Sequence, residues 1–183
     1  MTHVTLAVTG SISAYKAADI TSQLGKLGYS VSVLMTEAAS HFITPLTLQV
    51  LSKNPVSLDL MDEPRPDKVN HIEIGKETNL FLVAPATANT IAKLANGLAD
   101  NMVTATALAL PSHVKKAIAP AMNTKMHENP LTQHNLERLK KFGWEIIKPR
   151  EAVLACGDHG TGALADVNII IEKVKEIINE KTI

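Results

Sequence analysis

The chain has 183 residues, of which 45% are hydrophobic and 20% charged, and this composition excludes an intrinsically disordered protein. Its 18 basic residues balance its 18 acidic ones, so the charge gives no sign of a nucleic-acid or membrane-surface partner. One cysteine excludes an internal disulfide, and the lack of a long apolar run or a basic leader predicts a single cytoplasmic domain over residues 1–183.

The first part of the chain alternates short apolar runs with apolar residues at helical spacing. A strand, a helix and a second strand follow one another within the length of a parallel crossover. Gly28 is placed to end the first helix, because glycine readily adopts the left-handed conformation found there. The expected elements are strands over 4–8 and 31–35 and helices over 14–27, 37–42 and 45–52.

The rest of the chain continues this alternation. Residues 80–85 are apolar at every position, which predicts a strand buried on both faces. Residues 62–70, with two prolines, and residues 151–165, rich in glycine, are expected to be loops. The other expected elements are strands over 114–119 and 144–147 and helices over 90–98, 101–110, 130–142 and 169–178. The pattern predicts an α/β fold, a doubly wound parallel sheet in one three-layer domain.

Several polar segments directly follow predicted strands. In an open parallel sheet, ligands bind beyond the carboxyl ends of the strands, so these segments are expected to converge on one site. In the first of them, Gly10 allows a tight turn, and Ser11 and Ser13 with free amides suit a phosphate. Either serine could instead cap the helix. The spacing is not GxGxxG, so the dinucleotide fingerprint fails.

Two later segments offer hydrogen bonds to a ligand. Thr87 and Asn89 can bond a heterocycle or a phosphate, or can cap the next helix. Asn123 can donate to a carboxylate while Met122 packs against a ring, although asparagine is also common in turns for backbone reasons. The convergence of these segments therefore argues for a site more strongly than any one segment does.

Two side chains are candidates for chemistry. His71 follows the proline-containing loop and can act as a general acid or base. Cys156 lies beside Asp158 in a polar loop with three glycines, which predicts an accessible thiol on a mobile lid over a catalytic pocket. No tight cluster of metal-ligating residues recurs, so no metal is expected.

These segments together resemble the motifs of the homo-oligomeric, flavin-containing cysteine decarboxylases. Residues 85–90 resemble the PASANT motif of that family, with a threonine in place of its serine. Residues 120–127 resemble its PxMNxxMW motif, with a histidine in place of the tryptophan. Residues 69–73 resemble the segment that carries its active-site histidine, and residues 155–164 resemble its substrate-clamp loop.

The resemblance implies a flavodoxin-like fold, bound FMN, and a homo-oligomer (a trimer or a dodecamer) with FMN at a subunit interface. It implies that His71 is the acid/base residue, that Cys156 donates a proton and that Asn123 holds the substrate carboxylate. The residues implied to contact FMN are Gly10, Ser11, Ile12, Thr36, Thr87, Ala88, Asn89, Thr90 and Ala121, and those implied to close over the substrate are Val153, Ala155 and Leu164.

The resemblance also implies a reaction, the decarboxylation of 4′-phosphopantothenoylcysteine to 4′-phosphopantetheine in coenzyme A biosynthesis. An unactivated cysteine carboxylate does not leave, because the carbanion cannot delocalise. In the family, the flavin oxidises the cysteinyl thiol to a thioaldehyde, loss of CO₂ gives an enethiolate, and the reduced flavin returns the hydride. Cys156 is placed for the required proton, and the neutral donor Asn123 suits a carboxylate whose charge is lost.

Other members of the fold family are alternatives for the function. An oxidative peptidyl-cysteine decarboxylase stops at the enethiol and needs no proton donor, so Cys156 speaks against it. A non-catalytic flavin-binding regulatory subunit would be favoured by loss of that cysteine, which is present. Flavin prenyltransferases share the fold but do not carry the set of His71, Asn123 and Cys156.

Overall fold

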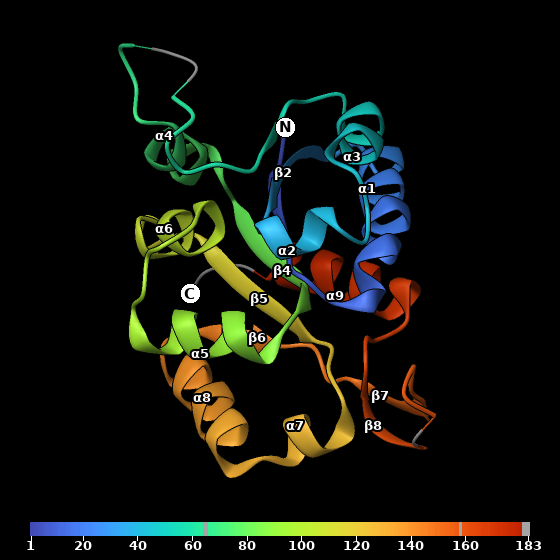
Figure 1. The fold of residues 1–183 in the computed structure, drawn as a ribbon. Coiled ribbons are helices and arrows are strands. Elements are labelled where there is room, and N and C mark those ends of the chain that lie inside the picture. Colours follow the sequence, from blue (N-terminus) through green and yellow to red (C-terminus); the bar gives the residue numbers. More distant parts are fainter. Residues whose placement is uncertain (64–65, 158, 181–183) are drawn as a thin grey trace.

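The structure, a computed structural model, describes residues 1–63, 66–157 and 159–180. Parallel strands form a six-stranded sheet in the order β3-β2-β1-β4-β5-β6 (Figure 1). The strands are β1 (His3–Val8), β2 (Ser30–Met35), β3 (Val56–Ser57), β4 (Leu80–Ala86), β5 (Lys115–Pro120) and β6 (Trp144–Ile146). The doubly wound parallel sheet predicted from the alternating elements is confirmed.

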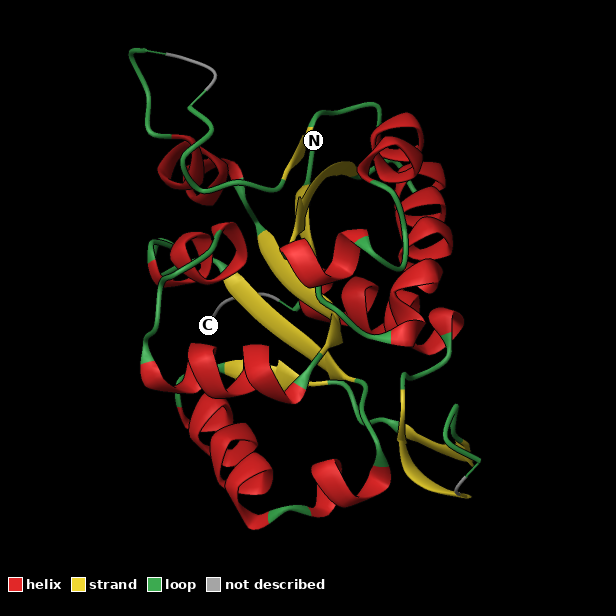
Figure 2. Cartoon of the chain, in the orientation of Figure 1, coloured by secondary structure: helices red, strands yellow, loops and turns green. Residues whose placement is uncertain are grey.

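Helices cover both faces of this sheet (Figure 2). One face carries α1 (Ala17–Lys26), α3 (Pro45–Ser52) and α9 (Val167–Asn179), and the other carries α4 (Asn70–Glu77), α5 (Ala88–Asn96), α6 (Met102–Leu108) and α8 (Pro130–Lys141). Shorter turns are η1 (Ile12–Lys16), α2 (Glu37–Ser40) and α7 (Thr124–Glu128). Among the described residues, no helix is long and apolar enough to cross a membrane.

The central strand β4 shows why its sequence is apolar at every position. Leu80 and Leu82 point into the core with α1 and α9, while Phe81 and Val83 point into the core with α5, α6 and α8. All four side chains are fully buried. Successive strand residues face opposite sides, so a strand with helices on both faces has no solvent-facing position to fill with polar residues.

The structure contains some helices and strands that the sequence did not predict. β3 has two residues, too few for a periodic pattern, and α4 begins after Val69 without a side-chain cap. α7 is also additional, and residues 151–165, expected to be a loop, contain an antiparallel hairpin of β7 (Arg150–Val153) and β8 (His159–Ala163). The two glycines of β8 hide the alternation of a strand there. Pro64 and Asp158, named in the two expected loops, lie outside the described residues.

The order of the strands creates a crevice at one edge of the sheet. From β1 the chain runs outward to β2 and β3 on one side, then returns to place β4 on the other side of β1. The loops after β1 and β4 therefore leave in opposite directions, and the space between them is where open α/β sheets bind ligands.

Candidate functional site

A cavity of about 520 Å³ lies at the carboxyl ends of β1, β4 and β5. Its walls come from η1 and the turn before it, the start of α5, the segment after β5, and the β7–β8 hairpin. The expected site residues that line it are Gly10, Ser11, Ile12, Thr87, Ala88, Asn89, Ala121, Asn123, Val153, Ala155, Cys156 and Leu164. The structure thus brings together segments from four separate parts of the chain, while the role of each residue stays a prediction.

A second cavity of about 450 Å³ adjoins the first, and both are lined by Gly10, Thr87 and Asn89. It contains the two remaining residues expected to contact FMN, Thr36 and Thr90. The hydroxyl and amide groups of this cavity are the donors and acceptors that a phosphate or a polyhydroxyl chain requires.

The second cavity also contains charged side chains. Lys93 Nζ lies 2.5 Å from Asp100 Oδ2, and the hydrogen bond from Lys93 holds the pKa of Asp100 below its usual value. Asp100 is therefore ionised at neutral pH and compensates the charge of Lys93. The exposed carboxylate of Glu37 is a further lining group.

Hydrogen bonds at the helix starts fix the polar side chains of both cavities. Ser11 Oγ accepts from the backbone N–H of Ser13 at 3.2 Å, and Thr87 Oγ1 accepts from the N–H of Thr90 at 3.3 Å. Both residues therefore do cap helices, as the alternative interpretation of these segments expected. Capping holds each hydroxyl beside the cavity, so it is compatible with a binding role.

Thr9 connects the two loops of the crevice and was missed by the sequence analysis as a site residue. Its buried Oγ1 donates to the carbonyl of Pro85 at 2.7 Å and accepts from the N–H of Thr87 at 3.0 Å. One hydroxyl thereby fixes the loop after β1 to the end of β4. The sequence carries no signal for this link, because the partners lie 76 residues apart or more.

Replacing Thr9 with valine is expected to destabilise the fold and weaken the site. Valine has the same shape but leaves the buried Pro85 carbonyl and Thr87 N–H without this partner, at a cost of about 2 kcal/mol. For a chain of this size, that lowers Tm by roughly 4 to 8 °C in calorimetry. Thr9→Ser keeps the hydroxyl and is the control. A valine variant as stable as the serine variant would show that the link contributes little.

The β7–β8 hairpin docks onto the segment after β5 through its backbone. The N–H of Met122 donates to the carbonyl of Gly162 at 2.9 Å, and Asn123 Nδ2 lies 3.1 Å from the exposed Sγ of Cys156. A Cβ on Gly162 would lie 2.3 Å from the oxygen of Met122, so a side chain there cannot be accommodated without displacement. The accessible thiol predicted for Cys156 is confirmed, and the hairpin brings it to the cavity.

For the flavin enzyme that the resemblance implies, Gly162→Ala is expected to reduce turnover at least about tenfold while leaving flavin binding close to that of the wild type, because it displaces the hairpin and not the loops of the crevice. Gly157→Ala is the matched control. Gly157 also has a positive φ, of 89°, in the same hairpin, but an added Cβ would meet nothing within 4 Å. Steady-state kinetics and a flavin titration of both variants test this. Equal losses in both would mean that backbone strain, not docking, matters.

His71 lies apart from the other expected catalytic residues. It is in the first turn of α4 and lines neither cavity of the crevice. In Figure 1, α4 and the hairpin lie at opposite ends of the molecule. The Nδ1 atom of His71 is buried and has no hydrogen-bond partner among the described residues. One chain therefore does not join His71 to Asn123 and Cys156.

Ion pairs join Glu73, which lies on α4 two residues after His71, to two lysines. Glu73 lies 2.8 Å from Lys68 and 2.7 Å from Lys76, and hydrogen bonds from these lysines lower the pKa of Glu73 to about 2. The carboxylate of Glu73 is therefore ionised over the physiological pH range.

His127, which stands where the family motif has tryptophan, lines neither cavity. Its backbone N–H donates to the carbonyl of Asn123 at 2.9 Å, and its own carbonyl accepts from Gln133 Nε2. Burial lowers the pKa of its imidazole, so the ring is neutral at pH 7. The described contacts of His127 are thus with the protein backbone around α7.

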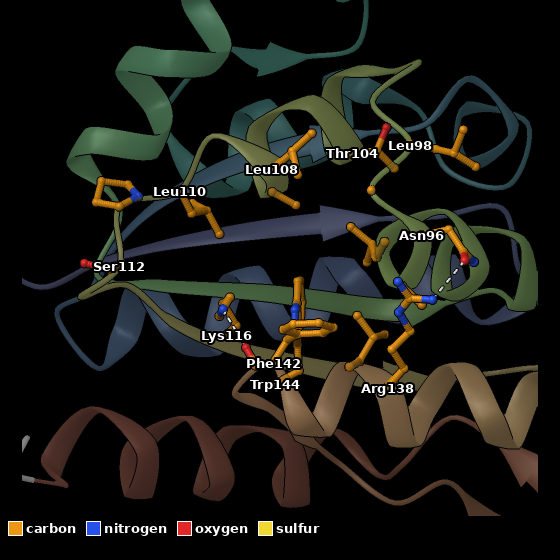
Figure 3. A pocket seen from close by; sticks show the side chains of 16 residues that line it. Asn96, Leu98, Thr104, Leu108, Leu110, Ser112, Lys116, Arg138, Phe142 and Trp144 are labelled. Atoms are coloured by element: carbon orange, nitrogen blue, oxygen red, sulfur yellow. Dashed lines mark hydrogen bonds between the residues drawn. The ribbon is translucent and has the colours of Figure 1, made fainter.

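A further cavity, of about 390 Å³, lies between α5, α6 and α8 (Figure 3). Lys116 and Trp144 line it and lie at the amino ends of β5 and β6. The cavity is therefore at the opposite edge of the sheet from the crevice. Lys116 Nζ lies 5.9 Å from the Trp144 ring and donates to the Phe142 carbonyl, and Arg138 donates to Asn96 Oδ1 at 3.5 Å. Both cations are thus engaged within the chain, and the cavity contains none of the expected site residues.

Within residues 1–63, 66–157 and 159–180, no group of three or more His, Cys, Asp or Glu side chains is arranged to hold a metal ion.

Comparison with known sequences finds relatives along almost the whole chain. A family model described as Flavoprotein matches residues 1–179. The chain is 62% identical over 173 residues to a probable phosphopantothenoylcysteine decarboxylase of Streptococcus mutans, covering 94% of this chain and 97% of that protein. It is 43% identical over 180 residues to the coenzyme A biosynthesis bifunctional protein CoaBC of Bacillus subtilis, covering 98% of this chain but only 44% of that protein.

Solved structures share the fold. A cysteine-to-serine mutant of PPC decarboxylase complexed with pantothenoylaminoethenethiol matches with a TM-score of 0.86 and 33% identity, covering 96% of this chain and 97% of that chain. The FMN-dependent cysteine decarboxylase SpaF matches with a TM-score of 0.85 and 27% identity, covering 97% and 95% of the two chains.

Proposed function

Because the chain belongs to the Flavoprotein family, we propose that it is an FMN-dependent decarboxylase that converts 4′-phosphopantothenoylcysteine to 4′-phosphopantetheine in coenzyme A biosynthesis. The observation that carries this proposal is the docking of the hairpin, which brings the thiol of Cys156 within 3.1 Å of the Asn123 amide at the crevice. A proton donor beside a carboxylate-binding group is required to form a saturated product and is not required by an enzyme that stops at the enethiol.

The residues of the crevice fit FMN. The smaller cavity offers the hydroxyls of Thr36, Thr87 and Thr90, which suit the phosphate and the ribityl chain. The larger one adds the apolar surface of Ile12 and Ala121, which suits an aromatic ring system. We assign these residues to the cofactor, together with Gly10, Ser11, Ala88 and Asn89.

When bound, FMN supplies reversible two-electron redox chemistry at the cysteinyl side chain, which is what allows its carboxylate to leave. Asn123 holds that carboxylate through its amide, a neutral donor that does not oppose the loss of negative charge. Val153, Ala155 and Leu164 line the cavity from the hairpin side and restrict water over the substrate. The thiol of Cys156 then supplies the proton that completes the saturated product.

The position of His71 supports the proposal that the chain forms a homo-oligomer, a trimer or a dodecamer. Its imidazole is remote from Cys156 within one chain, so the His71 that acts as acid or base at a given cavity comes from a second copy. Each site is then built from two chains and is incomplete in a monomer.

The proposal extends to the domain organisation and to the cellular compartment. Residues 1–183 form one flavoprotein domain, since the family model spans nearly all of them and both cores pack on a single sheet. The enzyme works in the cytoplasm, where an exposed catalytic thiol such as Cys156 stays reduced.

The test is product analysis of the purified protein reconstituted with FMN. With 4′-phosphopantothenoylcysteine, the protein should release CO₂ and 4′-phosphopantetheine without net consumption of an oxidant. Release of the enethiol alone would assign the chain to the oxidative decarboxylases. Failure to take up FMN would overturn the proposal altogether.

A further inference from the structure

Two cationic side chains line the larger cavity. Its described lining residues include the cations Lys16 and Arg150 and no acidic side chain. Lys16 is the last residue of η1 and directly precedes the buried Ala17 of α1, so its backbone is anchored to the core. A cavity lined in this way favours an anionic ligand.

The two cations differ in what they already bind. Arg150 Nε lies 3.3 Å from the carboxylate of Asp166 and donates to the carbonyl of Leu164 at 3.3 Å, so its charge is compensated within the chain. Lys16 forms no ion pair with any residue that the structure describes. Its ammonium group is thus the cationic side chain of this cavity that no described carboxylate neutralises.

The proposed substrate is anionic at both ends. Its cysteinyl carboxylate belongs at Asn123 and Cys156, which lie on the segment after β5 and on the hairpin. Its phosphate is at the opposite end of the pantothenoyl arm. Lys16 lies on a third wall, at the end of η1, and is absent from the hydroxyl-lined cavity that suits the phosphate of FMN.

We propose, on the basis of the proposed function, that Lys16 binds the phosphate of 4′-phosphopantothenoylcysteine and gives the enzyme its preference for the phosphorylated substrate. The lysine does not take part in bond breaking. It adds a charge-assisted contact that only the phosphorylated substrate can make.

The test compares two substrates, 4′-phosphopantothenoylcysteine and pantothenoylcysteine, in the wild type and in Lys16→Met. Methionine keeps an unbranched side chain without the charge. We expect kcat/KM for the phosphorylated substrate to fall roughly 10- to 100-fold, and kcat/KM for pantothenoylcysteine to stay within about twofold. Lys16→Arg should retain most of the preference. Lys26→Met, which removes a cation of α1 that lines neither cavity, is the matched control and should retain it fully.

A flavin titration distinguishes the phosphate of the substrate from that of the cofactor. FMN and riboflavin are each titrated into apo wild type and apo Lys16→Met while flavin fluorescence is followed. Unchanged affinity for both supports the proposal. Loss of affinity for FMN but not riboflavin would mean that Lys16 binds the cofactor's phosphate, and would overturn it.

The remaining outcomes also decide the matter. Equal losses of kcat/KM with both substrates would mean that Lys16 only supports the fold of η1, and would overturn the proposal. A wild type that uses both substrates equally well would overturn the role of Lys16 while leaving the proposed function standing. A wild type that uses neither would overturn both.

Discussion

Cys156→Ser should stop the reaction after decarboxylation, so that one turnover gives the enethiol and leaves the flavin reduced. The thiol lies 3.1 Å from the Asn123 amide, on the hairpin that covers the cavity. A serine hydroxyl is nearly the same size but is a far weaker acid, so it preserves the docking and removes the proton source. General acid catalysis typically contributes 10²- to 10⁴-fold, and we expect kcat for the saturated product to fall by about that factor.

Single-turnover mixing with 4′-phosphopantothenoylcysteine measures this, with flavin absorbance followed in time and products identified by mass spectrometry. Thr161→Ser is the matched control, since it changes another side chain of the same hairpin, lines neither cavity and keeps the thiol. It should complete the reaction. Saturated product formed by Cys156→Ser at the wild-type rate would show that the thiol is a bystander.

The sheet could be predicted from the sequence because its strands are marked by burial. Residues 80–85 are apolar throughout, and β4 is indeed covered on both faces. The convergence of the site followed from the same pattern, since loops after parallel strands share one edge. β7 was missed because its residues are mostly exposed and show no apolar alternation, and β8 was missed because two of its five residues are glycines.

Parts of the site depend on contacts that no local pattern reports. Thr9 joins two loops through a hydroxyl whose partners are distant in sequence. The sequence around Thr9 does not distinguish it from any other threonine that follows a strand. Lys16 is distinguished only by the absence of a nearby described carboxylate, which differs from the situation of Arg150. Such facts follow from the packing of remote segments and not from composition.

The position of His71 bears on how a complete site is assembled. The family motifs assign His71, Asn123 and Cys156 to one active site, but within one chain the fold separates His71 from the other two. The helix α4 lies away from the hairpin (Figure 1), and the buried Nδ1 of His71 finds no partner among the described residues. The proposed homo-oligomer, in which a second copy presents its α4 to the crevice, would bring the two parts of the site together.

Mixed oligomers of two inactive variants are therefore expected to regain activity. His71→Asn and Cys156→Ser should each lose nearly all turnover alone. In an oligomer assembled from equal amounts of both, a site is intact when its histidine comes from a Cys156→Ser chain and its cysteine from a His71→Asn chain. In a random mixture half of the chains meet each condition, so about one quarter of the sites are intact. In an isolated hybrid trimer, which contains both variants, one of the three sites is intact, so about one third of the wild-type activity should return.

The control mixes Cys156→Ser with Asn123→Ala. Both residues line the same cavity of one chain, so every site in that mixture lacks one group and activity should not return. Co-expression with two different tags, followed by sequential affinity purification, isolates the hybrids, and native mass spectrometry verifies their composition before the assay. If verified hybrids of His71→Asn and Cys156→Ser are as inactive as the parents, His71 acts within its own chain or not at all. If both mixtures recover equally, the interface runs between Asn123 and Cys156 as well, and the single-chain cavity is not the unit of catalysis.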